Sequence, residues 1–412
     1  MTTSSQSFDC LFFFCSEFCA SFSSSDERIL YRFTFPAGIF FVNLISGLLI
    51  GEVAINQYEQ NINTSKEAPS SFKDLADDLL TIDGLDVGQF VSITSILINY
   101  CIVSFALMRS GEVAVDLASA LSLADANSLS ETSLAIGFTA LVTTLVSTQS
   151  RKTLSQITSG AVALLFMSFG SILLPGLANM QQDVMTTLST PGTSESFLDG
   201  MSIAAPIFIS TMVYQNIVPT VTKLLEYDRT KVMTTLTIGS AIPMIIYTAW
   251  CTAVLGGGIS IDAAGGTGLQ SILLLAFSTA SIGGSSIACV MSLAEEFKSQ
   301  LSTNIENEST EGADFSLPVV ALAALPPLGA GLLFSNGEGM RTALELAGSF
   351  GSPLLYGILP TLLAWKQKDI FSKSLQERVE MVPGGNFSQI ALLVASTGFI
   401  GAQLFSKVEF LL

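Results

Sequence analysis

The chain of 412 residues is 49% hydrophobic and only 12% charged, whereas a soluble domain carries about twice that charged fraction, so the composition predicts a membrane protein. The net charge of −17 argues against a nucleic-acid partner, because its phosphates would be repelled. The chain contains no His, which excludes a Ser-His-Asp triad, a His-ligated metal and a His proton relay.

The first 36 residues predict no spanning helix. Their apolar run of about a dozen residues is interrupted by Glu17 and is shorter than the roughly 20 residues that a bilayer requires. No positively charged region precedes this run, as a signal peptide would need, and the Ser content is only weakly typical of a transit peptide. We interpret residues 1–36 as a poorly ordered or atypical amino-terminal segment.

Ten apolar segments follow, most of them close to the roughly 20 residues needed to cross a bilayer. They are continuous or helically patterned rather than alternating, which favours a helical bundle over a barrel. We therefore predict an all-α polytopic membrane protein. The predicted spans are 37–56, 89–108, 133–148, 157–176, 202–222, 235–255, 270–294, 316–334, 342–365 and 387–406.

The orientation follows from the Lys and Arg residues, which are in excess in cytoplasmic loops. The loops after the odd-numbered spans contain twelve of them, while those after the even-numbered spans contain only Arg109 and Arg341. The odd-numbered loops are therefore predicted to face the cytoplasm or its equivalent, and the first span to enter from the outer side. This topology leads us to expect one further spanning helix upstream.

The fifth span contains an unusual polar stretch, STMVYQNIVPTV at 210–221. Pro219 lacks an amide hydrogen and would clash with the carbonyl of Gln215, so the helix should open around 214–218. Broken helices near the midplane are how many secondary transporters bind a zwitterion or an ion. Tyr214 could bound an aromatic substrate; an ordinary kink with interhelical polar packing is the alternative. The predicted hydrogen-bonding residues are Ser210, Thr211, Gln215 and Asn216.

This region resembles the aromatic and hydroxy amino acid permeases, the group that contains tyrosine- and tryptophan-specific transporters. The resemblance covers about 37–405, and its motifs occur in the same order. They include SGLLIGEV at 46–53, LPPLGAGLLF at 325–334 and YGILPTLLAWKQK at 356–368. Within the fifth span and the segment after it, the shared residues are Pro206, Ser210, Thr211, Tyr214, Gln215, Val218, Pro219, the loop YDRTK, Gly239, Ser240 and Pro243.

The resemblance implies a leucine-transporter-type bundle of two inverted five-helix repeats plus one further helix, the first helix of each repeat being broken. The permease domain is then 37–406, with a first-repeat remnant at 37–176, a second repeat at 202–365 and the extra helix at 387–406. The family's glycine-rich first helix has no counterpart in residues 1–36 apart from FPAG at 35–38. We expect a truncated amino terminus, with an altered activity as the alternative.

Two further helices contain candidate site residues. Asn99, Tyr100 and Ser104 recur at helical spacing and could face a substrate, or could bond neighbouring helices instead. The resemblance places hydroxyls of the seventh span where related transporters bind sodium, and close packing of small residues is the alternative. These ion-coupling candidates are Ser278, Thr279 and Ser281.

Two carboxylates, Glu52 and Glu112, lie nearest the apolar segments and could carry a coupling proton, because a carboxylate inside the membrane is costly unless it is functional or paired. An interfacial position is the simpler interpretation of both. Arg109 lies one turn before Glu112 and is its predicted partner.

These observations predict a secondary active transporter, a symporter of amino acids such as tyrosine or tryptophan, that works by alternating access and is driven by a proton or sodium gradient. No GxxxxGK[ST] loop is present, so ATP would not drive it directly. No enzyme activity, metal or cofactor is implied; the expected partners are an amino acid and the lipid bilayer of a plasma or plastid membrane. The alternative is a non-transporting membrane protein or an inactive permease remnant.

Overall fold

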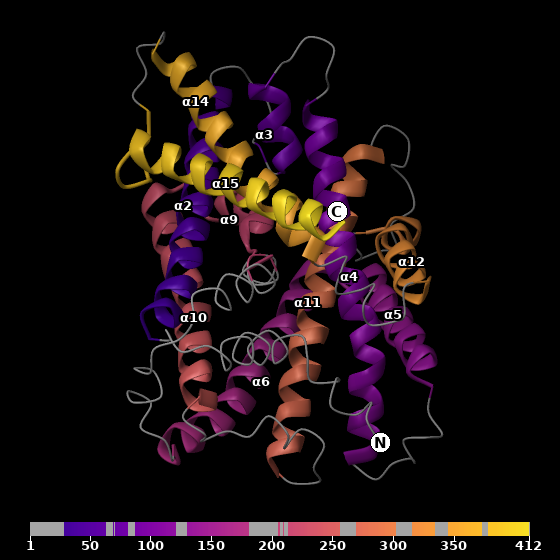
Figure 1. Ribbon diagram of the computed structural model, residues 1–412. Helices are drawn as coiled ribbons and strands as arrows, with labels where there is room; N and C mark the ends of the chain where they lie inside the picture. The colour runs from indigo at the N-terminus through magenta and orange to yellow at the C-terminus, as the bar shows by residue number, and fades with distance from the viewer. Residues whose placement is uncertain are drawn as a thin grey trace. The chain divides into compact units, whose positions relative to one another are not determined.

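Every regular element among the described residues of the computed structural model is a helix (Figure 1). This agrees with an amino-acid sequence in which apolar segments are long and uninterrupted, because a backbone in lipid must satisfy its own hydrogen bonds. The structure describes residues 29–62, 69, 71–80, 87–120, 130–180, 205–206, 209, 213–255, 269–301, 315–333, 345–372 and 378–411.

Eight stretches of these residues are long and apolar enough to cross a membrane. Together they confirm the predicted all-α polytopic membrane protein. They lie in α2 (Ile29–Ile62), α4 (Val87–Ala120), α5 (Glu131–Thr148), α6 (Arg151–Ala178), α10 (Arg229–Leu255), α11 (Leu269–Leu301), the stretch Ala347–Ser372 and α15 (Asn386–Leu411).

The two remaining predicted spans differ from these eight. The segment predicted at 316–334 forms α12 (Leu317–Leu333), a shorter apolar helix that contains Pro326 and Pro327. The segment predicted at 202–222 is not one continuous helix, because Val213 and Tyr214 have no helical conformation.

The chain divides into two compact units, each made of stretches that are not consecutive in the sequence. Unit one comprises 99–200 and 247–344, and unit two comprises 30–98, 201–246 and 345–411 among the residues up to the end of α15. The two inverted repeats and the extra helix at 387–406 stay a prediction.

Unit one is built around α11, which packs against α5, α6 and α12. Small side chains permit this packing: a Cβ added to Gly284 of α11 would lie 3.6 Å from the Cβ of Ala161 of α6. Phe169 of α6 packs with its ring centroid 5.6 Å from those of both Trp250 and Phe277. These contacts make an apolar and aromatic core for the unit.

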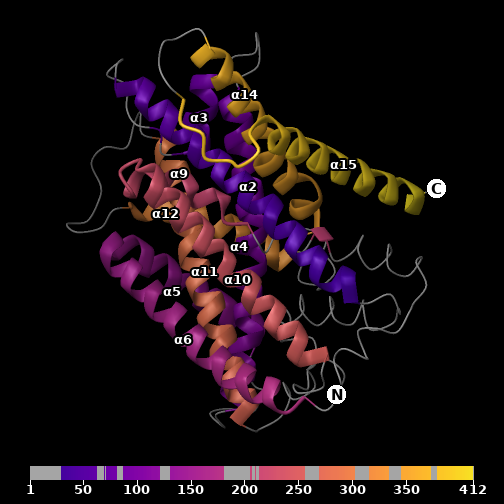
Figure 2. The ribbon, with the colours of Figure 1, turned by 90° about the vertical axis from the view of Figure 1, so that its left-hand side faces the viewer.

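Unit two contains the two spans with the largest buried share, Gly38–Asn61 of α2 and Ala347–Ser372, each with 72% of its apolar window inside the protein. The stretch Ala347–Ser372 combines two π-helices, η5 (Ala347–Gly351) and η6 (Leu354–Ile358), with α14 (Leu359–Ser372). The helix α15 packs against α14 and η6 (Figure 2).

A short amphipathic helix, α3 (Phe72–Leu79), packs against α14 in unit two. A reciprocal capping box between Ser71 and Asp74 begins it. Beside it, the rings of Tyr58 and Tyr227 stack with centroids 4.0 Å apart, and the Tyr227 hydroxyl donates to the carbonyl of Pro69 over 3.0 Å. Burial, and then the nearby Tyr58 and Asp74, raise the pKa of Tyr227 to about 12.

Candidate functional site

The helix break predicted in the fifth span is present, but Pro219 does not cause it in the expected way. Val213 and Tyr214 are non-helical, a 3₁₀ turn η3 (Gln215–Ile217) follows, and α9 (Val218–Leu224) then begins. Pro219 is therefore the second residue of a new helix, where its missing amide hydrogen has no partner to lose. Since no continuous helix runs from Gln215 to Pro219, the clash expected in such a helix does not arise.

The break is held to α2 by side chains around Asn43. The Tyr214 hydroxyl donates to the Asn43 carbonyl over 3.1 Å, and Gln215 Nε2 donates to Asn43 Oδ1 over 2.8 Å. Gln215 Oε1 in turn accepts from the Tyr214 amide over 2.9 Å. Gln215 is completely buried, so its amide must be paired within the protein.

A second set of contacts joins the break to the π-helical segment. The Tyr356 hydroxyl of η6 donates to Asn216 Oδ1, and the Tyr356 carbonyl accepts from the Ser46 hydroxyl of α2. Single π-helical turns widen a helix and are frequent at functional sites. The three elements thus meet in a polar cluster made of Asn43, Ser46, Tyr214, Gln215, Asn216 and Tyr356.

The polar cluster is electrically neutral and incompletely paired. Among the described residues, Asn43 Nδ2 is buried without a hydrogen-bond partner, and Asn43 is only 7% exposed. A buried amide hydrogen that is left unpaired costs about 1–3 kcal/mol. A bound ligand with an acceptor oxygen could supply the missing bond.

Two glycines of this unit lie where a larger residue would have no space. A Cβ on Gly47 of α2 would lie 2.5 Å from the Tyr214 hydroxyl. A Cβ on Gly348 of η5 would lie 2.5 Å from the carbonyl carbon of Pro206 and closer still to its oxygen. Pro206, one of the residues of the sequence motif, therefore lies directly against the π-helical segment.

The comparisons agree with this architecture. The model of the tryptophan/tyrosine permease family matches residues 33–403. The chain belongs to this family. The permease is accordingly an integral multi-pass membrane protein of an amino acid transporter family, and the family is one of transporters rather than enzymes. No curated protein matches the chain.

Five further residues were predicted to bind the substrate. Ser210 and Thr211 lie outside the described residues. Asn99, Tyr100 and Ser104 belong to unit one, where Asn99 is buried. Their role in substrate binding stays a prediction.

The hydroxyls of Tyr100 and Ser104 bond α4 to α12 instead. Tyr100 donates over 2.8 Å to the carbonyl of Leu322, and Ser104 donates over 2.8 Å to the carbonyl of Pro327. Pro326 lacks the amide hydrogen that would otherwise pair with Leu322. The geometry matches the alternative of hydrogen bonding between helices.

The predicted ion-coupling hydroxyls lie together on α11 in unit one. Thr279 is exposed, whereas Ser278 and Ser281 are half-buried. The Thr279 hydroxyl donates to the Leu275 carbonyl of its own helix over 2.8 Å. Such bonds are common for hydroxyls on a helix and do not by themselves indicate an ion site. Sodium binding here stays a prediction.

The two candidate carboxylates are both paired. Glu112 forms the predicted ion pair with Arg109, which is buried in unit one. Glu52 in unit two forms an ion pair with Arg378, a partner that the sequence did not suggest. The chain itself therefore supplies a positive partner to each carboxylate.

Proposed function

We propose that the permease is a secondary active transporter of aromatic amino acids, such as tyrosine or tryptophan, that works by alternating access and is driven by a proton or sodium gradient. The observation that carries the proposal is the polar cluster at the helix break, with its buried and unpartnered Asn43 Nδ2. Family membership supports amino acid transport, and the cluster supports a polar substrate held beside a broken helix.

The cluster supports a zwitterionic substrate because it carries no formal charge. Val213 and Tyr214 are non-helical, and non-helical backbone at membrane depth is tolerated where it is buried in protein or lines a cavity, as a substrate site would. The unpaired Asn43 Nδ2 is a donor and would suit an acceptor oxygen of the substrate, such as its carboxylate or the hydroxyl of tyrosine. The half-buried Tyr214 would add an apolar ring face for stacking.

The test is uptake of labelled tyrosine and tryptophan by proteoliposomes under an imposed proton or sodium gradient, with other neutral amino acids as competitors. Gln215→Leu removes the bond to Asn43 Oδ1 and should raise the KM about tenfold, because a buried hydrogen bond contributes roughly 1 kcal/mol and its orphaned partner costs more.

The matched control is Gln389→Leu. Gln389 is a buried Gln of α15 in the same unit, outside the polar cluster, and its replacement should leave the KM within about twofold of the wild-type value. Gradient-driven uptake of neutral aliphatic amino acids alone would reassign the substrate. Absence of any gradient-driven flux would favour the non-transporting alternative.

A further inference from the structure

The segment between α14 and α15 is fixed to α2 through its backbone. Its residues 378–382, here called the strap, belong to the yellow coil beside α2 and α14 in Figure 2. Asn56 of α2 pairs with both backbone groups of Val379: its Nδ2 donates to the carbonyl over 2.9 Å, and its Oδ1 accepts from the amide over 2.8 Å. The Asn56 side chain thus pairs both backbone polar groups of Val379, which has no regular secondary structure to pair them.

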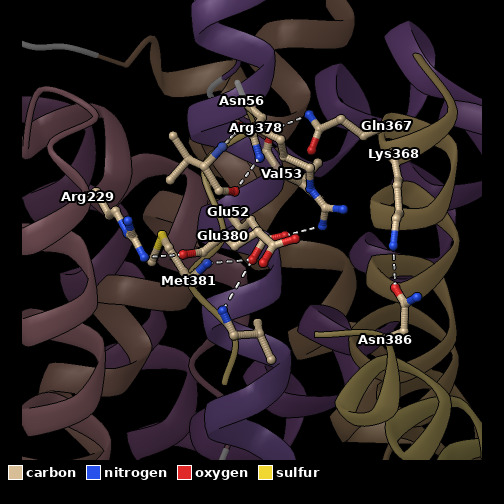
Figure 3. Close-up of polar contacts among 12 residues, drawn as sticks. Glu52, Val53, Asn56, Arg229, Gln367, Lys368, Arg378, Glu380, Met381 and Asn386 are labelled. Carbon is tan, nitrogen blue, oxygen red and sulfur yellow. Dashed lines mark hydrogen bonds and ion pairs between the residues drawn. The ribbon is translucent and has the colours of Figure 1, made fainter. Parts of the chain in front are cut away.

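Glu52 holds the rest of the strap (Figure 3). One carboxylate oxygen accepts from the Arg378 guanidinium, and the other accepts from the amides of Met381 and Val382 over 2.8 and 3.2 Å. Glu52 lies one turn before Asn56 and is only 1% exposed. Hydrogen bonds to a buried charge are the strong ones, so Glu52 is the principal anchor of the strap.

The strap also contacts a second helix. Arg229, the first residue of α10, donates to the carbonyl of Glu380 (Figure 3). Met381 is 4% exposed, and its methyl carbon would lie 3.6 Å from a Cβ on Gly51 of α2. The strap is therefore tied to α2 and α10 by its middle, and it leads into α15 at its end.

The arrangement is poorly suited to an ion-coupling role for Glu52. Its oxygens already accept three hydrogen bonds, and a sodium ion bound there would lie beside the Arg378 charge, which would repel it. The strap lies in the loop after the ninth predicted span, on the Lys- and Arg-rich side.

We propose that Glu52 is a positioning residue that latches the strap to α2, so that the cytoplasmic ends of α2, α10 and α15 are held together during transport. The proposal rests on the proposed function, since it assigns Glu52 to the transport cycle rather than to ion coupling. Releasing the latch frees the strap and lets these helix ends separate. The transport rate then falls while the substrate site keeps its affinity.

The first test measures the strap without measuring transport. Met381→Cys is introduced into a chain whose six native Cys are replaced, and its labelling by a membrane-impermeant maleimide is timed in inside-out vesicles. The buried thiol should react slowly, and Glu52→Gln should accelerate its labelling at least fivefold, because the neutral amide no longer binds Arg378 as an ion pair. An unchanged labelling rate overturns the latch.

The matched control breaks another polar contact of the same region. Lys368 of α14 donates over 2.7 Å to Asn386 of α15 at an exposed position, and Lys368→Met should leave Met381→Cys labelling unchanged (Figure 3). Asn56→Ala removes the two bonds to Val379 without altering charge and should accelerate labelling as well. If Glu52→Gln does not fold, Asn56→Ala decides the test in its place.

The second test is uptake kinetics. Glu52→Gln should lower the maximal rate at least fivefold with the KM within twofold of wild type, in contrast to the KM effect expected of Gln215→Leu. A normal rate with altered ion dependence would overturn the latch in favour of ion coupling. If labelling accelerates but the wild-type protein shows no gradient-driven flux, the latch stands and the proposed transport function fails.

Discussion

Replacing Gly348 by Ala should destabilise the permease strongly, because the new methyl group has no space. Its Cβ would lie 2.5 Å from the Pro206 carbonyl carbon and 3.1 Å from the Pro206 Cα, with the carbonyl oxygen closer still. Real Cβ atoms do not approach other heavy atoms within 3.0 Å. Since the obstacle is backbone rather than a flexible side chain, η5 or the segment at Pro206 must move.

The cost follows from overpacking. Forcing an additional methyl group into a packed interior costs about 1–3 kcal/mol, and a backbone obstacle places Gly348→Ala at the upper end of that range. A change of 1 kcal/mol shifts the midpoint of thermal unfolding by about 2 °C or less in a chain of this size. We therefore expect the midpoint to fall by on the order of 5 °C.

The assay is the thermal unfolding of purified protein in detergent, followed by the loss of the monodisperse peak in size-exclusion chromatography. Gly398→Ala in α15 is the control, because a Cβ there meets no atom within 4 Å. Ala also favours a helix by up to about 1 kcal/mol over Gly, so the control should be unchanged or slightly more stable. If Gly348→Ala unfolds together with the control, the close approach of η5 to Pro206 is wrong.

Three further predictions concern other contacts of the structure. Tyr100→Phe should cost about 1–2 kcal/mol by leaving the Leu322 carbonyl unpaired, which thermal unfolding can measure against wild type. The pKa of Tyr227 is raised to about 12 in the folded protein, so its protonated hydroxyl stabilises the fold fully below about pH 10, and this stabilisation is lost as the pH rises through 12. Tyr227→Phe should remove that part of the pH dependence of the unfolding midpoint. Gly47→Ala should displace the Tyr214 hydroxyl and raise the KM for aromatic substrates several-fold in uptake assays, while an unchanged KM would argue against Tyr214 as a substrate contact.

The fold class and the helix positions could be predicted because they depend on local composition. An apolar segment of about 20 residues indicates a span, and the predicted ranges other than 202–222 lie within or close to the observed helices. The presence of a helix break could be predicted from Tyr214, Gln215 and Pro219. The role of Pro219 in that break could not be predicted, because a Pro can begin a new helix as well as interrupt a continuous one.

The partners within the candidate site could not be predicted from the sequence. Asn43 lies 172 residues from Gln215, and Glu52 lies 326 residues from Arg378. Patterning shows which residues are polar within an apolar span, and Asn43 met that criterion in the first predicted span, but it does not show which distant residue each one contacts. The sequence could therefore name Glu52 as a candidate for a coupling proton, but it could not show that Arg378 is its partner.

The irregular helices of the permease explain why its buried hydroxyls and amides lie where they do. A proline or a π-helical turn frees a backbone carbonyl, and in an apolar environment an unpaired carbonyl is costly. The Tyr100 hydroxyl pairs with the carbonyl that Pro326 leaves free, and the Ser46 hydroxyl pairs with the Tyr356 carbonyl of η6.

A count of the hydrogen bonds made by Asn43 singles out its side-chain nitrogen. Gln215 and Tyr214 already use its two oxygens, whereas its Nδ2 has no partner among the described residues. Other buried amides of unit two donate to a neighbouring helix, as Gln367 Nε2 of α14 does over 3.0 Å to the carbonyl of Val53 of α2. In the proposed function the substrate supplies that bond, and binding would recover the free energy of the buried amide only when the substrate presents an acceptor there.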